Sequence, residues 1–156
     1  MLYAWIKIIH IISAAILFGT SMGTAFYMFY VNTQKDIRLI AMATKQVVFV
    51  DWVFTGAAAI TQFVTGFILV YLKDYSPTSF WIIGGVVGYM IAGACWIPVV
   101  YLQIRCRDLA WDALSNNTSL SATYYRYYKM WWILGIPAFF SLTVVFYFMA
   151  NRPVSG

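Results

Sequence analysis

The stretch from Tyr3 to Val31, YAWIKIIHIISAAILFGTSMGTAFYMFYV, contains one lysine, one histidine and no acidic residue. A helix of about 20 apolar residues crosses the hydrocarbon core of a bilayer, so this run is long enough to span a membrane. Turn-prone, polar connections separate it from three similar runs, which predict an all-α, integral membrane, antiparallel four-helix bundle forming one domain over residues 1–156. These runs are Gln46–Leu72, Phe80–Leu102 and Met130–Ala150.

The composition of the chain also indicates a membrane protein. Apolar residues make up 63% of it and charged residues 10%, whereas soluble domains have roughly 45–50% and 25%. The net charge is +5, but the basic residues fall mainly in two connections and form no stripe that could follow a phosphate backbone. We therefore exclude a soluble domain, expect the lipid bilayer as the surroundings, and do not expect a nucleic acid partner.

The distribution of basic residues predicts how the bundle is oriented. Cytoplasmic loops of membrane proteins carry an excess of lysine and arginine, and seven basic residues lie on one face of the predicted bundle against three on the other. We expect the richer face to be cytoplasmic and both termini to be periplasmic, in a bacterial inner membrane. The richer face carries Lys35, Arg38, Lys45, Arg105, Arg107, Arg126 and Lys129, and the poorer face Lys7, Lys73 and Arg152.

Two further features lie on the predicted cytoplasmic side. The stretch from Arg105 to Asp112 is expected to continue the third span as a helix, because Asp108 can pair with Arg105 about one turn away. The aromatic residues between Tyr124 and Trp132 are expected to form a belt at the membrane surface, where Tyr and Trp are enriched.

Three ionisable residues lie inside the predicted spans: Lys7, His10 and Asp51. Such residues are costly in a membrane and are by default candidates for function. Lys7 and His10 are three residues apart and share a helix face, while Asp51 begins a polar stripe that continues through Gln62 and Thr65. Both faces are expected to point into the bundle.

His10 is the only histidine, and equal helical rises put it at the level of Thr65 and Gly66 on the second span and of Gly84 to Gly88 on the third. Two interpretations follow. In the first, the helices close tightly around a histidine that is hydrogen-bonded to a serine, a threonine or a backbone carbonyl.

In the second interpretation, Gly66, Gly85 and Gly88 leave a slot for haem b or a porphyrin. His10 would then be the axial ligand of the iron, and Lys7, one turn nearer the outer surface, would meet a propionate. His10 is a metal ligand only in this sense, because the cysteines, the histidine and the aspartate have no ligand spacing for another metal site.

Asp51 lies near the cytoplasmic end of the second span, at the level of Gln103 and Arg105 on the third. A carboxylate within a membrane either takes up a proton or seeks a cation. We expect an ion pair with Arg105, with Lys45 as the alternative cation and a proton relay as the functional alternative. Gln62 and Gln103 are expected to be structural polar residues.

Several motifs, spread over nearly the whole chain, carry a resemblance to a known family. The most specific is Gly93-Ala94-Cys95-Trp96-x-Pro98-Val99-Val100-x-x-Gln103. The others are Trp5-x-Lys7-x-x-His10, Phe18-Gly19, Asp51-Trp52-x-Phe54-Thr55, Gln62, Thr65-Gly66 and Trp132-x-x-Gly135-x-Pro137-Ala138. In these motifs the chain resembles bacterial predicted integral membrane proteins known as domain of unknown function 2269, a resemblance that implies no particular activity.

A more distant resemblance rests on Trp5, Lys7, His10 and Gly19. In these residues the chain is similar to the small four-helix membrane protoporphyrinogen IX oxidases, whose first helix is associated with tetrapyrrole binding. The chain has Met28-Phe29-Tyr30 where that family has a Pro-Arg pair. The resemblance therefore implies a porphyrin site more than the oxidase reaction.

The sequence thus leads to two hypotheses of different classes. The first is haem or porphyrin binding at His10, with a membrane redox or tetrapyrrole role. The second is a non-enzymatic membrane subunit or assembly factor whose glycine faces pack against the helices of a partner protein or of a second copy. Small-molecule transport ranks third, because the spans carry no paired charges that could couple it. Whether the protein is an enzyme stays open, since no nucleophile motif or acid–base pair is present.

Overall fold

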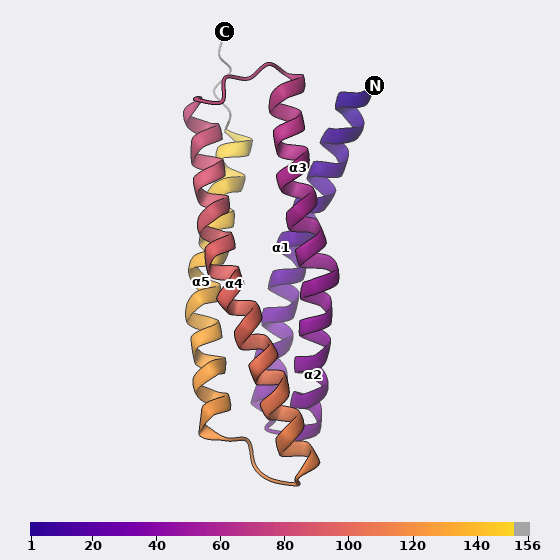
Figure 1. Cartoon of the computed structure of the whole chain (residues 1–156), viewed down its shortest axis with the longest axis vertical. Helices are drawn as coiled ribbons and strands as arrows, with labels where there is room; N and C mark the ends of the chain where they lie inside the picture. The colour runs from indigo at the N-terminus through magenta and orange to yellow at the C-terminus, as the bar shows by residue number, and fades with distance from the viewer. Residues whose placement is uncertain (152–156) are drawn as a thin grey trace.

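The computed structural model describes residues 1–151, which form long helices joined by short connections (Figure 1). Arg152, one of the basic residues assigned to the poorer face, lies outside them. Within this part of the chain, four helices are long and apolar enough to cross a membrane, and they run antiparallel in sequence order. The predicted all-α four-helix membrane bundle is confirmed. The helices are α1 (Leu2–Gln34), the continuous rod of α2 (Ile37–Val50), η1 (Asp51–Gly56) and α3 (Ala57–Leu72), then α4 (Phe80–Ser115) and α5 (Ala122–Ala150).

Side-chain caps start two of the helices earlier than the apolar runs suggested. The second rod begins at Ile37 because the Asp36 carboxylate accepts the backbone N–H of Arg38 at 2.8 Å. Ser121 likewise accepts the N–H of Tyr124, at 3.2 Å, and starts α5. Helices of 33 and 36 residues are about 50 Å long and exceed the ~30 Å hydrocarbon core. The bundle therefore extends beyond the bilayer, at the end where the connections after α1 and α4 lie.

The hydrophobic core is concentrated in this extended end of the bundle. Tyr124 is completely buried in it, and its hydroxyl donates to the side-chain oxygen of Asn32 at 2.9 Å. Trp131 is also buried, whereas Tyr125 is exposed. The predicted aromatic belt is thus wrong for Tyr124 and Trp131, because α5 begins well before the membrane and turns these two side chains inward. The core residues are Met28, Val31, Ile40, Ala41, Ala43, Val47, Val99, Leu102, Cys106, Ala110, Tyr124 and Trp131.

The continuation of the third span as a helix is confirmed, since α4 runs without a break to Ser115. The ion pair on it differs from the expected one. Asp108 accepts two hydrogen bonds from its neighbour Arg107, with a shortest distance of 2.8 Å, and not from Arg105.

The bundle consists of two helix pairs. α1 packs along α2, η1 and α3, and α4 packs along α5, while the two pairs meet mainly through α2 and α4 (Figure 1). Towards the other end of the molecule the two pairs diverge, as Figure 1 shows. The site described below lies between these two pairs.

Glycines on α4 bring it close to α5. A Cβ added at Gly85 would lie 2.6 Å from Met149, and one at Gly88 would lie 2.8 Å from Val145. The Ser141 hydroxyl also donates to the backbone carbonyl of Gly88 at 2.6 Å. The expected close packing at these glycines is found, and its partner within the chain is α5.

Candidate functional site

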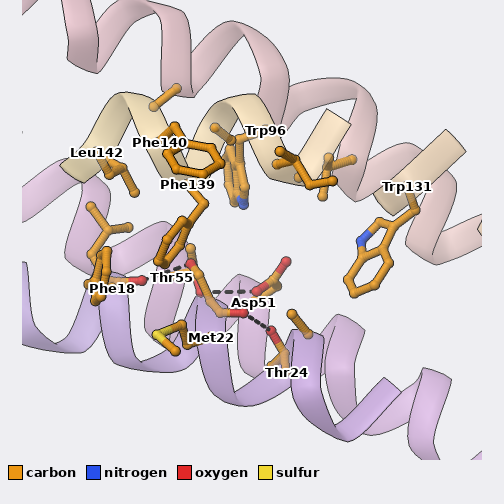
Figure 2. A pocket seen from close by; sticks show the side chains of 18 of the residues that line it. Phe18, Met22, Thr24, Asp51, Thr55, Trp96, Trp131, Phe139, Phe140 and Leu142 are labelled. Carbon is orange, nitrogen blue, oxygen red and sulfur yellow. Dashed lines mark hydrogen bonds between the residues drawn. The ribbon is translucent and has the colours of Figure 1, made fainter. Parts of the chain in front are cut away.

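A cavity of about 420 Å³ lies between the two helix pairs (Figure 2). Small residues make room for it, among them Ala59, Ala92, Gly93 and Gly135. A Cβ added at Gly93 or at Gly135 would meet nothing within 4 Å. We call this space the central cavity. Its wall is formed by Leu17, Phe18, Ser21, Met22, Thr24, Ala25, Phe26, Phe29, Asp51, Thr55, Ala59, Tyr89, Ala92, Gly93, Trp96, Val99, Gln103, Trp131, Trp132, Gly135, Ile136, Ala138, Phe139, Phe140 and Leu142.

Aromatic contacts join the two helix pairs at one end of the central cavity. The ring of Phe18 on α1 lies 4.8 Å from that of Phe139 and 5.4 Å from that of Phe146, both on α5. The Tyr89 hydroxyl of α4 donates to the backbone carbonyl of Ala59 on α3 at 2.7 Å. This end of the cavity is therefore apolar apart from one hydroxyl, whose hydrogen is already used.

The polar end of the central cavity is built around Asp51, whose side chain is 4% exposed. One carboxylate oxygen accepts the Thr55 hydroxyl at 3.0 Å, and the other accepts the side-chain N–H of Gln103 at 2.7 Å. The Thr55 hydroxyl also lies 3.1 Å from that of Thr20 on α1. Asp51 is thus held by side chains of its own helix and of α4, and the network extends to α1.

The segment that carries Asp51 is a π-helix, η1. Its wider turn leaves Asp51 and Thr55 buried and pointing into the bundle, while Trp52, Val53 and Phe54 are exposed to the surroundings. Single π-turns inside α-helices occur frequently at functional sites. In this chain the π-turn carries the buried carboxylate of Asp51.

Three polar atoms beside the carboxylate are buried and form no hydrogen bond of good geometry: Gln103 Oε1, Trp96 Nε1 and Trp131 Nε1. Figure 2 shows Asp51 between the two indoles, with the nitrogen of Trp96 directed towards the carboxylate. Buried polar atoms in proteins nearly always have a partner. Trp96 faces the carboxylate, so this end of the cavity offers the Oε1 of Gln103 as an acceptor and the Nε1 of Trp131 as a donor to a molecule that enters it.

The predicted ion pair between Asp51 and Arg105 is wrong. Among residues 1–151 the only ion pair joins Arg107 and Asp108, and the buried Nε of Arg105 has no hydrogen-bond partner. Gln103 precedes Arg105 by two residues, which points the two side chains to different faces of α4. The alternative cation, Lys45, lies over the ring of Trp111 at 5.7 Å instead.

His10 belongs to a second polar cluster, between α1 and α3. Its Nδ1 lies 2.8 Å from the Thr65 hydroxyl and its Nε2 lies 3.0 Å from the side-chain nitrogen of Gln62. Ser13 donates to the side-chain oxygen of Gln62 at 2.6 Å. A Cβ added at Gly66 would lie 3.4 Å from the imidazole. Counting helical rises therefore matched His10 to the correct level of the second span.

The remaining residues of the predicted haem site lie apart from His10. Gly85 and Gly88 face side chains of α5, and Lys7 is exposed. Within the described residues no group of three or more His, Cys, Asp or Glu side chains is placed to hold a metal ion. The structure thus brings together His10, Gln62 and Gly66, and separately Asp51 and Gln103.

Sequence reasoning identified Asp51 and Gln103 but missed the central cavity itself. The signal lay in the motifs of the family resemblance, because Asp51, Thr55, Gly93, Trp96 and Gln103 all line the cavity. Trp132, Gly135 and Ala138, from the last of those motifs, line it as well. Phe18, from a further motif, lines it too, so the motifs come from all four long helices, and only the fold shows that they surround one space.

The sequence model of a family described as "Predicted integral membrane protein (DUF2269)" matches residues 4–153 of this chain. No curated protein and no solved structure matches this chain. A similarity to the protoporphyrinogen IX oxidases is therefore not shown.

Proposed function

The chain belongs to the DUF2269 family of predicted integral membrane proteins, and we propose that it is a binding protein that holds an amphipathic small molecule in the central cavity. The observation that carries this proposal is the pairing of a largely apolar cavity with a small set of buried polar atoms at one end. Pockets for small molecules have this character, with an apolar lining and a few polar groups that fix the orientation.

The position of the polar atoms supports an amphipathic ligand. Asp51, its partner Gln103 and Trp131 lie at the end of the cavity nearer the basic end of the bundle, where the connections after α1 and α4 lie, and Phe18, Phe139 and Leu142 lie towards the opposite end. A molecule dissolved in one leaflet has the same arrangement, with its polar group at the surface and its apolar body in the hydrocarbon. Such a molecule would match the cavity along its length.

The geometry at His10 does not favour haem, and haem or porphyrin binding stays a prediction. Both ring nitrogens lie within hydrogen-bond distance of protein side chains, Thr65 and Gln62, which leaves neither free for iron. Met149 and Val145 occupy the space next to Gly85 and Gly88. An axial ligand needs a free nitrogen lone pair and room for the macrocycle, and the described residues provide neither at this level.

The hypothesis of a packing subunit loses part of its support for a similar reason. The glycine face of α4 already packs against α5 of the same chain. Protein partners and a second copy stay predictions.

We also propose that the protein lies in a bacterial inner membrane with both termini in the periplasm. The support is the excess of basic residues at the end of the bundle where α1 is connected to α2 and α4 to α5.

The proposal can be tested with 4-tert-butylcyclohexanol, a probe with an apolar body and one hydroxyl group. Binding to the protein in lipid nanodiscs is followed by tryptophan fluorescence, because Trp96, Trp131 and Trp132 line the cavity. Gly93→Leu places a side chain into the open space of the cavity. We expect a saturable change in tryptophan emission with the wild type and at least about a tenfold loss of affinity with Gly93→Leu.

Gly19→Leu is the matched control, because a Cβ at Gly19 also meets nothing within 4 Å but the residue is exposed and does not line the cavity. It should bind the probe as the wild type does, and empty nanodiscs correct for partitioning into lipid. Equal binding by Gly93→Leu and Gly19→Leu would contradict the proposal.

A further inference from the structure

We propose that the ligand of the central cavity is a lipophilic organic cation, whose charge lies against the Asp51 carboxylate and the unpaired side-chain oxygen of Gln103. This inference rests on the proposed function, because it names the chemical class of the molecule that the same cavity would hold.

No positive charge balances Asp51 among the described residues. Its two oxygens accept hydrogen bonds from Gln103 and Thr55, which are both neutral, and no cation of the described residues pairs with it. An ionised carboxylate that is buried without a positive partner bears a desolvation cost that two neutral hydrogen bonds offset only in part. A cationic ligand would supply the partner that the described part of the chain does not.

The neighbours of the carboxylate also favour a positive charge. Gln103 donates its side-chain N–H to Asp51, and its Oε1 is buried without a partner, so that it adds a second acceptor beside the carboxylate. A carboxylate and an amide oxygen together favour a positive charge and disfavour a negative one.

The size of the cavity and its apolar lining away from Asp51 favour an organic cation over a metal ion. Beyond the polar end the cavity is lined by aromatic and aliphatic side chains, including Phe18, Met22 and Phe139. A small hydrated metal ion would gain nothing there and finds no group of three ligands among the described residues. An ammonium group on an apolar body of one or two rings matches both ends of a 420 Å³ space.

The test compares cyclohexyltrimethylammonium with tert-butylcyclohexane, which have the same shape and differ by a positive nitrogen in place of a carbon. Both are titrated against the protein in nanodiscs and followed by tryptophan fluorescence. We expect the wild type to bind the cation at least about tenfold more tightly than the hydrocarbon. Asp51→Asn should remove this preference while it keeps affinity for the hydrocarbon, which also shows that the variant is folded.

Asp74→Asn is the charge-matched control, because Asp74 lies in the turn after α3, away from the cavity, and it should keep the preference. Asp51→Glu retains the charge and should keep it too, even if Asp51→Asn does not fold. Equal affinities of the wild type for both probes, or an unchanged preference in folded Asp51→Asn, would refute the cation while leaving the proposed function intact. No saturable binding of either probe, nor of 4-tert-butylcyclohexanol, would refute both.

Discussion

At Asp51 a carboxylate inside a membrane helix is held by an amide and a hydroxyl, with no cation beside it in the described residues. Counting residues from the membrane surface put Asp51 at the level of Gln103 and also of Arg105. It did not decide between the two, because a difference of two residues is only about 3 Å in height but some 200° around the helix. Depth along a span was therefore predictable, and the choice of partner depended on the rotation of α4.

A double-mutant cycle tests this assignment at the residue scale. Gln103→Leu removes the donor to the Asp51 carboxylate and should lower the free energy of unfolding in detergent by about 1–3 kcal/mol. Combined with Asp51→Asn, it should show a coupling energy on the order of 0.6 kcal/mol or more. The same cycle between Asp51 and Arg105 should give additive losses. Coupling to Arg105 and not to Gln103 would show that the ion pair exists after all.

At the scale of the elements, the apolar runs predicted which segments are helices but not where the helices begin or how they pair. The starts at Ile37 and Ala122 are set by capping residues outside the spans, Asp36 and Ser121. The π-turn at η1 leaves no signal in a uniformly apolar stretch. Helix pairing was equally hidden, because a membrane helix is apolar all around and its pattern does not mark the face that meets another helix.

The close contact of α4 with α5 gives a prediction at this scale. Gly88→Leu should force the two helices apart, because even a Cβ there would lie 2.8 Å from Val145. We expect a loss of about 1–3 kcal/mol, as for other overpacked sites, seen as a lower unfolding temperature in detergent. The smaller change Gly88→Ala should also lower the stability, and Val145→Ala, which shortens the side chain that faces Gly88, should recover part of that loss. A Gly88→Leu protein as stable as Gly19→Leu would mean that α4 and α5 do not touch at this level.

At the scale of the whole molecule, the bundle has its hydrophobic core at its extended end and encloses the central cavity between the helix pairs. The sequence predicted the class, the number of spans and their order, because these depend on the length and polarity of each segment alone. The central cavity depends on how two helix pairs diverge, which is a property of the assembled fold. It nevertheless collects motif residues from all four long helices, and it is the feature that a proposed function has to explain.

The orientation of the whole molecule can be measured with reporters fused after Gly156. An alkaline phosphatase fusion should be active and a fluorescent cytoplasmic reporter at the same point should be dark, because the end of the bundle richer in basic residues is expected to face the cytoplasm. The reverse pattern would overturn the proposed topology and would turn the polar end of the central cavity towards the periplasmic leaflet.

Native mass spectrometry of the protein released from its own membrane tests the central claim most directly, because it requires no assumption about the ligand. The account predicts that the wild type and Gly19→Leu carry one additional small molecule of the same mass, and that the double variant Gly93→Leu/Gly135→Leu, with its cavity filled, does not. An identical set of bound masses in all three proteins would contradict the assignment of the central cavity as a binding site.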